Sequence, residues 1–274
     1  MKFRSFIFKS LLFAGSLALL PALYSCGGDD EEDNKPKQDV PTPANGNEDD
    51  NPSNPNNPST PGNNDQDNGN VTVNGHQAID LGLPSGTKWA TMNIGAEKPE
   101  DYGLYFAWGE TKGYPQKTTH SFGIYNYTWY DKDKHRFTKY CTNRDDGLVD
   151  HKTTLELSDD AAHGYWGGSW RMPTVNEFEE LRDNTIQEWT SMSGIYGRKI
   201  TSKKNGNSIF MPATGHNDGS GVIAYGIYGC YWSSSLILSN SKSAHILRFK
   251  SDDLYIEGMF RECGLTIRPV IGKE

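Results

Sequence analysis

The sequence lacks the cluster of Lys and Arg with which nucleic-acid-binding proteins neutralise phosphates. Its 27 Lys and Arg are outnumbered by 35 Asp and Glu. The sequence also has no repeat of fixed period, which excludes solenoids and propellers. We therefore expect neither a nucleic-acid partner nor a repeat architecture.

Cysteine is scarce, with four in 274 residues. No Cys-x-x-Cys pair or regular Cys/His spacing is present, so we expect no zinc site and no bound metal. Beyond Cys26 the cysteines are Cys141, Cys230 and Cys263, an odd number, so at least one thiol stays free or pairs with another chain. Cys230 and Cys263 are the expected disulfide because both fall in the strand-rich C-terminal part, although the sequence leaves the pairing open.

No apolar run reaches the roughly 20 residues that a membrane-spanning helix needs. The run from Leu11 to Leu23 is shorter, and it follows the cationic residues Lys2, Arg4 and Lys9. A short apolar run behind a cationic start is typical of a secretory signal. Residues 1–25 are therefore predicted to be a signal peptide.

The signal ends in Leu-Tyr-Ser-Cys at residues 23–26. This segment resembles the lipobox of bacterial lipoproteins, in which the cysteine becomes the acylated first residue of the mature chain. The acidic residues 29–33 that follow resemble the export tag of surface lipoproteins in Bacteroidota. The resemblance implies a lipid anchor on Cys26 and an outer-membrane lipoprotein exposed on the cell surface, with a periplasm-facing anchor as the alternative.

Residues 26–70 are predicted to be a disordered tether. Residues 27–70 contain eleven Asp and Glu but only two Lys, and are otherwise rich in Asn, Pro and Gly. They offer almost no apolar surface to offset the entropy of ordering. A flexible chain of this length has an end-to-end distance of roughly 40 Å. The tether is either a spacer that holds a domain away from the membrane or a linker with no length requirement.

Residues 71–274 suit one domain of mixed strands and turns. Most of the negative charge lies in the tether, so this domain is close to neutral. An Asn205-Gly206 turn between two strand-like runs indicates a hairpin. The runs expected to be strands are His76–Leu81, Lys88–Ile94, Leu104–Trp108, Arg136–Cys141, Arg198–Ser202, Ser208–Pro212, Gly229–Ser234, Ala244–Phe249, Leu254–Met259 and Leu265–Val270.

Two helices are predicted. The first is short, near residues 158–165, with Ser158 as its N-cap. The second begins after Thr174, where Thr174 and Glu177 have the spacing of a capping box. Phe178 would then lie on the face toward the core. The fold class expected from these patterns is α+β, with many short strands and two helices.

The block Trp166–Phe178, which contains Trp170, Arg171, Pro173, Thr174, Glu177 and Phe178, resembles the Fibrobacter succinogenes major paralogous domain, a family of exported bacterial domains. The resemblance continues through residues 80–95, 105–110, 207–213, 231–235 and 267–270. More distantly, the block is similar to a segment of formylglycine-generating, sulfatase-modifying proteins. These likenesses imply a C-type-lectin-like fold for residues 71–274, in which the six named residues are structural.

The resemblance also implies that the activity of formylglycine-generating proteins is missing. That activity depends on two neighbouring cysteines that bind copper, and only Cys230 lies in a comparable stretch. One thiol cannot supply two soft ligands. We expect a protein that is not an enzyme and has no cofactor.

Two glycine-punctuated, aromatic segments are expected to form exposed loops that bind a ligand, because exposed rings suit sugars and protein partners. Oxygen ligands for calcium are available in both, at Asp131 and Asp133 and at Asn217 and Asp218, but no calcium-loop spacing is present. The candidate ligand-binding residues are Trp129 and Tyr130 in one loop and His216, Asn217, Asp218 and Tyr225 in the other.

The expected function is that of a surface lipoprotein that displays a recognition domain for a glycan or an envelope protein. Two alternatives stay open. One is an envelope enzyme or enzyme accessory descended from the formylglycine-generating fold, which a metal held by Cys230 and Cys263 would favour. The other is a subunit of a surface assembly, which a stable partner chain would favour.

Overall fold

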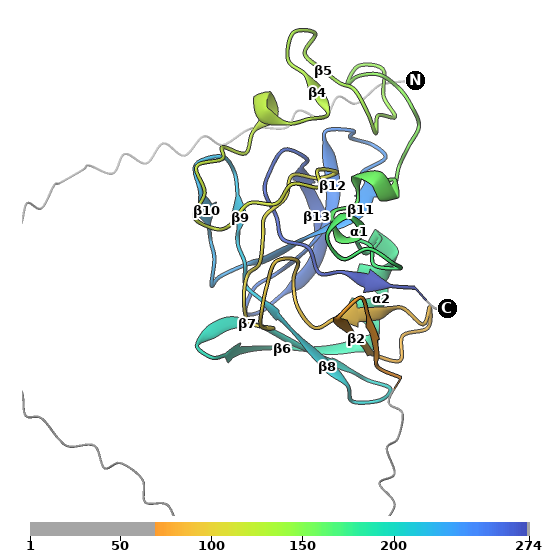
Figure 1. Ribbon diagram of the computed structural model, residues 1–274, viewed down its shortest axis with the longest axis vertical. Helices are drawn as coiled ribbons and strands as arrows, with labels where there is room; N and C mark the ends of the chain where they lie inside the picture. The colour runs from red at the N-terminus through yellow and green to blue at the C-terminus, as the bar shows by residue number, and fades with distance from the viewer. Residues whose placement is uncertain (1–68, 273–274) are drawn as a thin grey trace, which may run out of the picture. The chain divides into compact units, whose positions relative to one another are not determined.

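The computed structural model describes residues 69–272. The predicted signal peptide, the lipidation of Cys26 and the tether up to residue 68 lie outside the described residues. Within residues 69–272, no helix has both the length and the apolar character needed to cross a membrane. Figure 1 shows short strands around a few helical turns.

The described chain is mostly antiparallel sheet with two α-helices, which confirms the α+β class expected from the sequence. The helices are α1 (Ala161–Trp166) and α2 (Val175–Asn184), with 3-10 turns η1 (Ile124–Asn126) and η2 (Leu157–Asp159). The strands are β1 (Val71–Val73), β2 (His76–Asp80), β3 (Lys88–Ala90), β4 (Tyr130–Asp131), β5 (Arg136–Phe137), β6 (Thr185–Met192), β7 (Ile195–Ser202), β8 (Ser208–Pro212), β9 (His216–Asn217), β10 (Val222–Ile223), β11 (Gly229–Leu236), β12 (Ser243–Phe249), β13 (Leu254–Phe260) and β14 (Val270–Ile271).

Three sheets carry most of the pairing. One has the order β1-β2-β3-β14 and joins the beginning of the described chain to its end, with Val270 opposite Trp89. The second is β6-β7-β8, and the third is β11-β12-β13. The small hairpins β4–β5 and β9–β10 complete the set.

Strand β11 lies at the centre of the core, because every one of its residues is buried. Successive side chains of a strand point to opposite faces, so Trp232 packs into one core cluster and Tyr231 into another. The indole Nε1 of Trp232 donates to the carbonyl of Phe106 at 2.8 Å, and that of Trp108 donates to Ser233 at 2.8 Å. The aromatic side chains thereby fill the core, and their indole N–H groups satisfy backbone carbonyls in β11 and in the segment beside it.

Two arginines with no exposed surface hold loops together. Arg268 donates to the carbonyls of Ala90, Thr91 and Phe210 at 3.0–3.1 Å and to Asn93 Oδ1 at 2.8 Å. A buried guanidinium can satisfy several carbonyls at once, because it carries five N–H donors.

The second, Arg261, reaches the segment that precedes β5 and the segment that follows it. It donates to the carbonyls of Lys139, Tyr140 and Ser241 at 2.9–3.1 Å and to the hydroxyl of Tyr127 at 3.0 Å. Its guanidinium also lies 4.7 Å from the ring centre of Phe137. Arg261 therefore ties the β4–β5 region to the C-terminal strands.

The block around Trp170 is largely buried and leads into α2. Trp170 is fully buried, and Pro173 and Phe178 are also buried. The capping box is confirmed, with Thr174 and Glu177 bonded in both directions. Arg171 pairs with Glu177, Nη2 to Oε1, at 2.6 Å. These contacts stabilise the start of α2.

The expected start of the first helix is wrong. The helix α1 has Asp160 as its N-cap, and Asp160 Oδ1 accepts from the amides of Ala162 and His163. Ser158 instead lies in the 3-10 turn η2. Asp160 also accepts from the amide of Met172 at 2.8 Å, a long-range contact that fixes the cap and that local sequence does not reveal.

Several predicted strands are shorter than expected or absent. Residues 104–108 form only isolated bridges, Tyr105 to Tyr114 and Phe106 to Leu265. The strand predicted for residues 136–141 ends at Phe137, because the backbone groups that follow bond to loop residues. Conversely, β6 was not expected.

The expected disulfide is not formed, because Cys230 and Cys263 are both free thiols, as is Cys141. Cys230 is buried in the core cluster that contains Trp232, and Cys263 packs against that cluster. Burial raises the pKa of each of these two thiols to about 12. They behave as small core residues.

Candidate functional site

The described residues form several hollows, and one of them contains the predicted ligand-binding residue Trp129. Its volume is ≈ 250 Å³. We call it the Trp129 hollow. It is lined by Gly109, Glu110, Thr111, Lys112, Tyr114, His120, Asn126, Thr128, Trp129, Ser158 and Asp159. Rings, hydroxyls, an amide and carboxylates therefore meet in one small depression.

Trp129 is half-buried and held from two sides. Its Nε1 donates to the carbonyl of Gly109 at 2.8 Å, and the ammonium of Lys139 lies 5.0 Å from its ring centre. A Cβ at Gly109 would lie 3.1 Å from Trp129 Nε1, and the φ of +76° is one that favours glycine. The indole is thus fixed before any ligand arrives.

A second pair of rings borders the hollow. Tyr114 and His120 stack with centroids 3.7 Å apart. Burial lowers the pKa of His120, so its imidazole is neutral at pH 7 and stacks as an uncharged ring. Glu110 lies nearby and accepts from the amide of Thr128 at 2.7 Å.

The carboxylate of Asp159 already has partners within the protein. Its Oδ2 accepts from Lys139 Nζ and from the hydroxyl of Tyr140. Burial, helped by the hydrogen bond to Asp159, raises the pKa of Tyr140 to about 12. Burial opposes the charge on Lys139, but its bonds to Asp159 and Glu156 outweigh this and raise its pKa. At neutral pH this cluster is a fixed ion pair.

The structure does not place Tyr130 in the Trp129 hollow. Tyr130 packs edge-on against Phe137 with centroids 5.4 Å apart. It lines a separate hollow of ≈ 290 Å³ together with Phe260, Glu262 and other residues.

In the second predicted loop, the side-chain oxygens of Asn217 and Asp218 accept hydrogen bonds within the loop, whereas the Nδ1 of His216 is buried and bonds to no described group. Asn217 Oδ1 accepts from the amide of Gly219, and Asp218 Oδ1 accepts from the amide and hydroxyl of Ser220. His216 and Asn217 form β9, which pairs with β10. In the other loop, Asp131 accepts from the amides of Asp133 and Lys134. Among residues 69–272, no three His, Cys, Asp or Glu side chains are grouped as a metal site.

Tyr225 lies in an exposed apolar patch. The exposed fractions of Ile223, Tyr225 and Ile227 are 41%, 54% and 59%. The Tyr225 ring lies 6.4 Å from that of Tyr102. Tyr225 does not line the Trp129 hollow, although the two loops approach each other where Ser121 Oγ donates to the carbonyl of Gly219.

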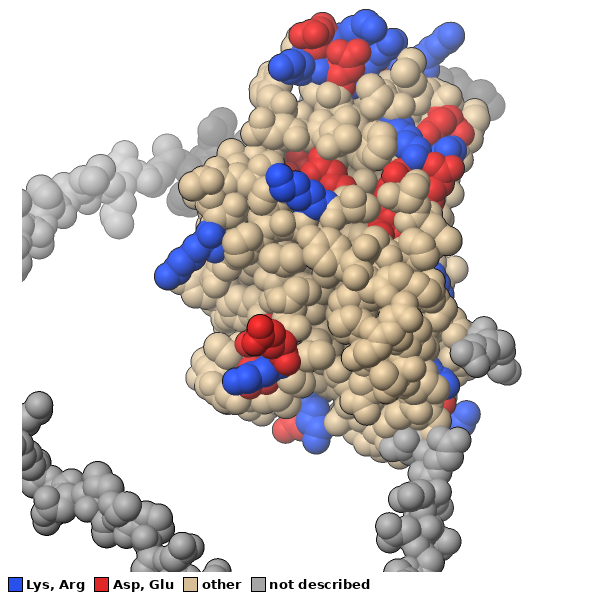
Figure 2. Space-filling model, viewed as in Figure 1, with Lys and Arg blue, Asp and Glu red and all other residues tan. Residues whose placement is uncertain are grey.

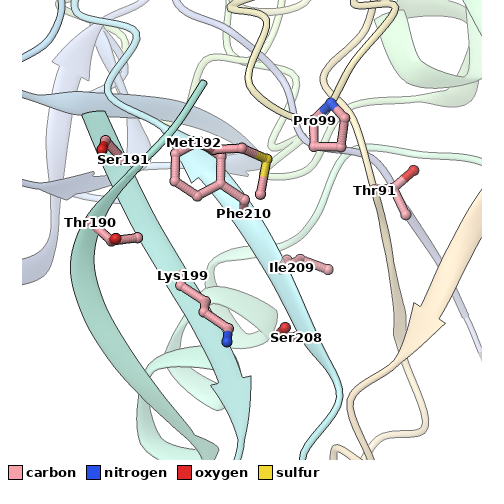
Figure 3. A pocket seen from close by; sticks show the side chains of 9 residues that line it. All are labelled: Thr91, Pro99, Thr190, Ser191, Met192, Lys199, Ser208, Ile209 and Phe210. Atoms are coloured by element: carbon pink, nitrogen blue, oxygen red, sulfur yellow. The ribbon is translucent and has the colours of Figure 1, made fainter. Parts of the chain in front are cut away.

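A further hollow was not foreseen from the sequence, because its wall includes the unexpected strand β6. It has a volume of ≈ 360 Å³ and lies on the sheet β6-β7-β8. Figure 3 shows Pro99, Met192 and Phe210 at one end of it and Lys199 and Ser208 at the other. Its lining is mainly apolar and includes no carboxylate.

No family model, no curated protein and no solved structure matches the chain. The assignment of a function therefore depends on the site geometry and on the sequence.

Proposed function

We propose that this chain is a surface-exposed outer-membrane lipoprotein whose folded part binds a glycan in the Trp129 hollow. The domain would be a non-enzymatic, C-type-lectin-like member of the Fibrobacter succinogenes major paralogous family. The observation that carries the proposal is the pre-positioned indole of Trp129 beside a rim of hydroxyl, amide and carboxylate groups.

The chemistry of the hollow matches that of a sugar. A sugar ring offers an apolar C–H face, which an aromatic ring covers, and a rim of hydroxyls, which polar side chains bind. Trp129 supplies the ring, and Glu110, Asn126 and Thr128 stand beside it as polar partners. Because the indole is already fixed, little side-chain entropy is lost on binding. The small volume suits a short glycan segment.

The N-terminal sequence supports a place at the cell surface. The lipobox ending at Cys26 would fix the chain to the membrane, and the tether would hold the domain roughly 40 Å away from it. Glycans at or near the cell surface would then be within reach of the Trp129 hollow.

A protein ligand is the second candidate, and the patch of Ile223, Tyr225 and Ile227 favours it. All three side chains are exposed, Ile223 at the end of β10 and the other two in the turn that follows it. Aromatic and aliphatic side chains of this kind anchor protein interfaces. A subunit role in a surface assembly would use the same patch.

A glycan-array screen of residues 27–274 tests the proposal. This form carries no lipid but includes all described residues. Saturable binding to one class of sugar that Trp129→Ala weakens at least about tenfold would support the proposal, because ring stacking contributes more than 1 kcal/mol. Tyr225→Ala is the matched control and should leave binding unchanged. Arms with calcium and with chelator report any dependence on the ion.

Two results would contradict the glycan proposal. One is the absence of sugar binding in either arm, and the other is loss of binding in Tyr225→Ala but not in Trp129→Ala. The second result, together with capture of a partner by the Tyr225 patch, would favour the protein ligand.

A further inference from the structure

The β4–β5 hairpin carries a hollow whose lining is rich in positive charge. Figure 2 shows Lys and Arg gathered with a few acids at the end of the molecule that carries this hairpin, above a largely uncharged face. The hollow has a volume of ≈ 560 Å³. We call it the cationic hollow. It is lined by Lys134, His135, Arg136, Arg144, Asp145, Gly147, Leu148 and Val149.

The backbone holds the two walls of this hollow together. The amide of Phe137 donates to the carbonyl of Asp146 at 2.9 Å, and the amide of Leu148 donates to the carbonyl of Phe137 at 2.9 Å. A Cβ on Gly147 would lie 2.2 Å from the Phe137 carbonyl oxygen, so only glycine permits this approach. The segment that carries Arg144 is thereby held beside the strand that carries Arg136.

The two arginines have no acidic partner. Among the described residues, no carboxylate oxygen lies within the 4.0 Å of an ion pair from Arg136 or Arg144. The Nε of Arg136 is buried and donates to no described group.

Nearby carboxylates do not cancel the positive charge. Asp131 Oδ2 pairs with Lys134 at 3.6 Å and Asp146 pairs with Lys242 at 3.3 Å. The pair with Asp131 offsets the charge of Lys134, which leaves Arg136 and Arg144 against Asp145, the one carboxylate on the lining. The hollow therefore keeps a net positive charge at neutral pH.

We propose that the cationic hollow binds the sulfate or carboxylate groups of an acidic polysaccharide. Planar guanidinium groups form paired hydrogen bonds with such anions. The exposed side chains of Leu148 and Val149, at 45% and 40%, offer an apolar wall for the C–H face of a sugar ring. An isolated inorganic anion would contact only the arginines, whereas a charged saccharide would contact both the arginines and the apolar wall.

This inference does not rest on the Trp129 hollow. Of the residues lining one hollow, none also lines the other. A neutral glycan at Trp129 and an acidic one at Arg136 are therefore separate predictions, which different variants test.

The experiment measures heparin binding to residues 27–274 by calorimetry, beside chemically desulfated, re-acetylated heparin and anionic phospholipid vesicles. The variants are Arg136→Gln, Arg144→Gln and their double mutant. Arg182→Gln is the matched control, since Arg182 lies on α2 and pairs with Asp183. Circular dichroism verifies that each variant is folded.

The expected result is binding of heparin that falls about tenfold in each single variant and further in the double mutant, because each loses charged hydrogen bonds. Arg182→Gln and Trp129→Ala should bind heparin as the unaltered chain does. Binding should also weaken with added salt, as screening of exposed charges requires. Weaker binding of the desulfated polymer would identify sulfate as the main group recognised.

Three outcomes would overturn the inference. Heparin could fail to bind the unaltered chain, or bind the folded double mutant equally well. Vesicles could bind while heparin does not, which would assign the hollow to lipid phosphates. If only sugar binding at Trp129 fails, the cationic hollow stands while the proposed function does not.

Discussion

Glu177 links three segments through one carboxylate. Its oxygens accept from Arg171 at 2.6 and 2.7 Å, from the Thr174 amide at 2.8 Å and from the Thr87 hydroxyl at 2.8 Å. Burial alone would raise its pKa, but the bonds from Arg171 and Thr174 outweigh burial and lower it. The carboxylate is therefore stabilised in its charged form.

Replacing Glu177 by Gln should cost about 2 kcal/mol at pH 7, because the Arg171 pair is partly buried. The folded-state pKa of Glu177 is below its unfolded value of about 4.3. The stabilisation is thus complete above that value and is lost as the pH falls through the folded value. Urea unfolding at pH 7 and pH 3 checks this, and the gap between the two proteins should shrink at pH 3. An equal gap at both pH values would contradict it.

Whether the role of a single residue can be predicted from the sequence depends on how far along the chain its partners lie. The roles of Thr174 and Glu177 were correct because a capping box is a local pattern four residues long. Arg261 and Arg268 were not singled out by any local pattern, because their partners lie up to 178 positions away in the sequence. Burial of an arginine depends on these distant carbonyls.

At the scale of the element, α1 depends on its cap. It has six residues, too few to be stable by itself in water. Asp160 accepts from the amides of Ala162, His163 and Met172 at 2.8–3.1 Å. The cap therefore joins α1 to the segment that leads into α2.

Asp160→Ala should cost about 2 kcal/mol or more, since it removes an N-cap and leaves a buried amide unpaired. Ser158→Ala, at the position where the sequence suggested the cap, should change stability by less than about 0.5 kcal/mol. Thermal unfolding of both variants measures the difference. A larger loss in Ser158→Ala than in Asp160→Ala would mean that the cap is wrongly assigned.

The sheet β6-β7-β8 depends on a close approach at Gly197. A Cβ there would lie 2.4 Å from the Met211 carbonyl oxygen and 2.7 Å from the Phe210 ring. Gly197→Ala should therefore cost about 2 kcal/mol by overpacking, and should distort the hollow of Figure 3. Gly123→Ala is the control, because nothing lies within 4 Å of a Cβ there. Equal melting temperatures for the two variants would refute this account.

Strands were predictable where apolar residues and turns agree. The strand β8 follows the Asn205-Gly206 turn and was predicted with its correct bounds, Ser208–Pro212. The strand β6 was missed because it lies at the edge of its sheet and is largely polar and exposed. Residues 104–108 were predicted to be a strand because they are apolar, but this character reflects burial alone. They pair only with isolated residues such as Leu265, so no continuous strand forms.

For the molecule as a whole, the free thiols give a direct measure of integrity. Cys141 and Cys230 are buried, Cys263 is partly so, and none of the three forms a disulfide. Burial raises the pKa of Cys230 and Cys263 to about 12, and a protonated thiol is a poor nucleophile. In residues 27–274, three thiols should react with a disulfide reagent after denaturation without reductant, and almost none before it. Reaction of a single thiol after denaturation would show that a bridge exists.

The candidate sites were predictable only in part. The aromatic loop that contains Trp129 was identified from its composition, and the structure places Trp129 at a hollow. The sequence could not separate Trp129 from Tyr130, because which neighbour turns toward which hollow depends on Gly109 and Phe137. The cationic hollow was missed because its walls come from two segments joined through Gly147.

Arg261 is synthesised well after the residues that it holds in place. Tyr127 and Tyr140, which it holds, leave the ribosome more than 100 residues before it does. A chain that stops short of Arg261 contains every residue that lines the Trp129 hollow and the cationic hollow, yet lacks the guanidinium that holds Tyr127, Lys139 and Tyr140. Termination before Arg261 would thus release a chain in which the residues of both hollows are present but the loops that Arg261 holds are not fixed.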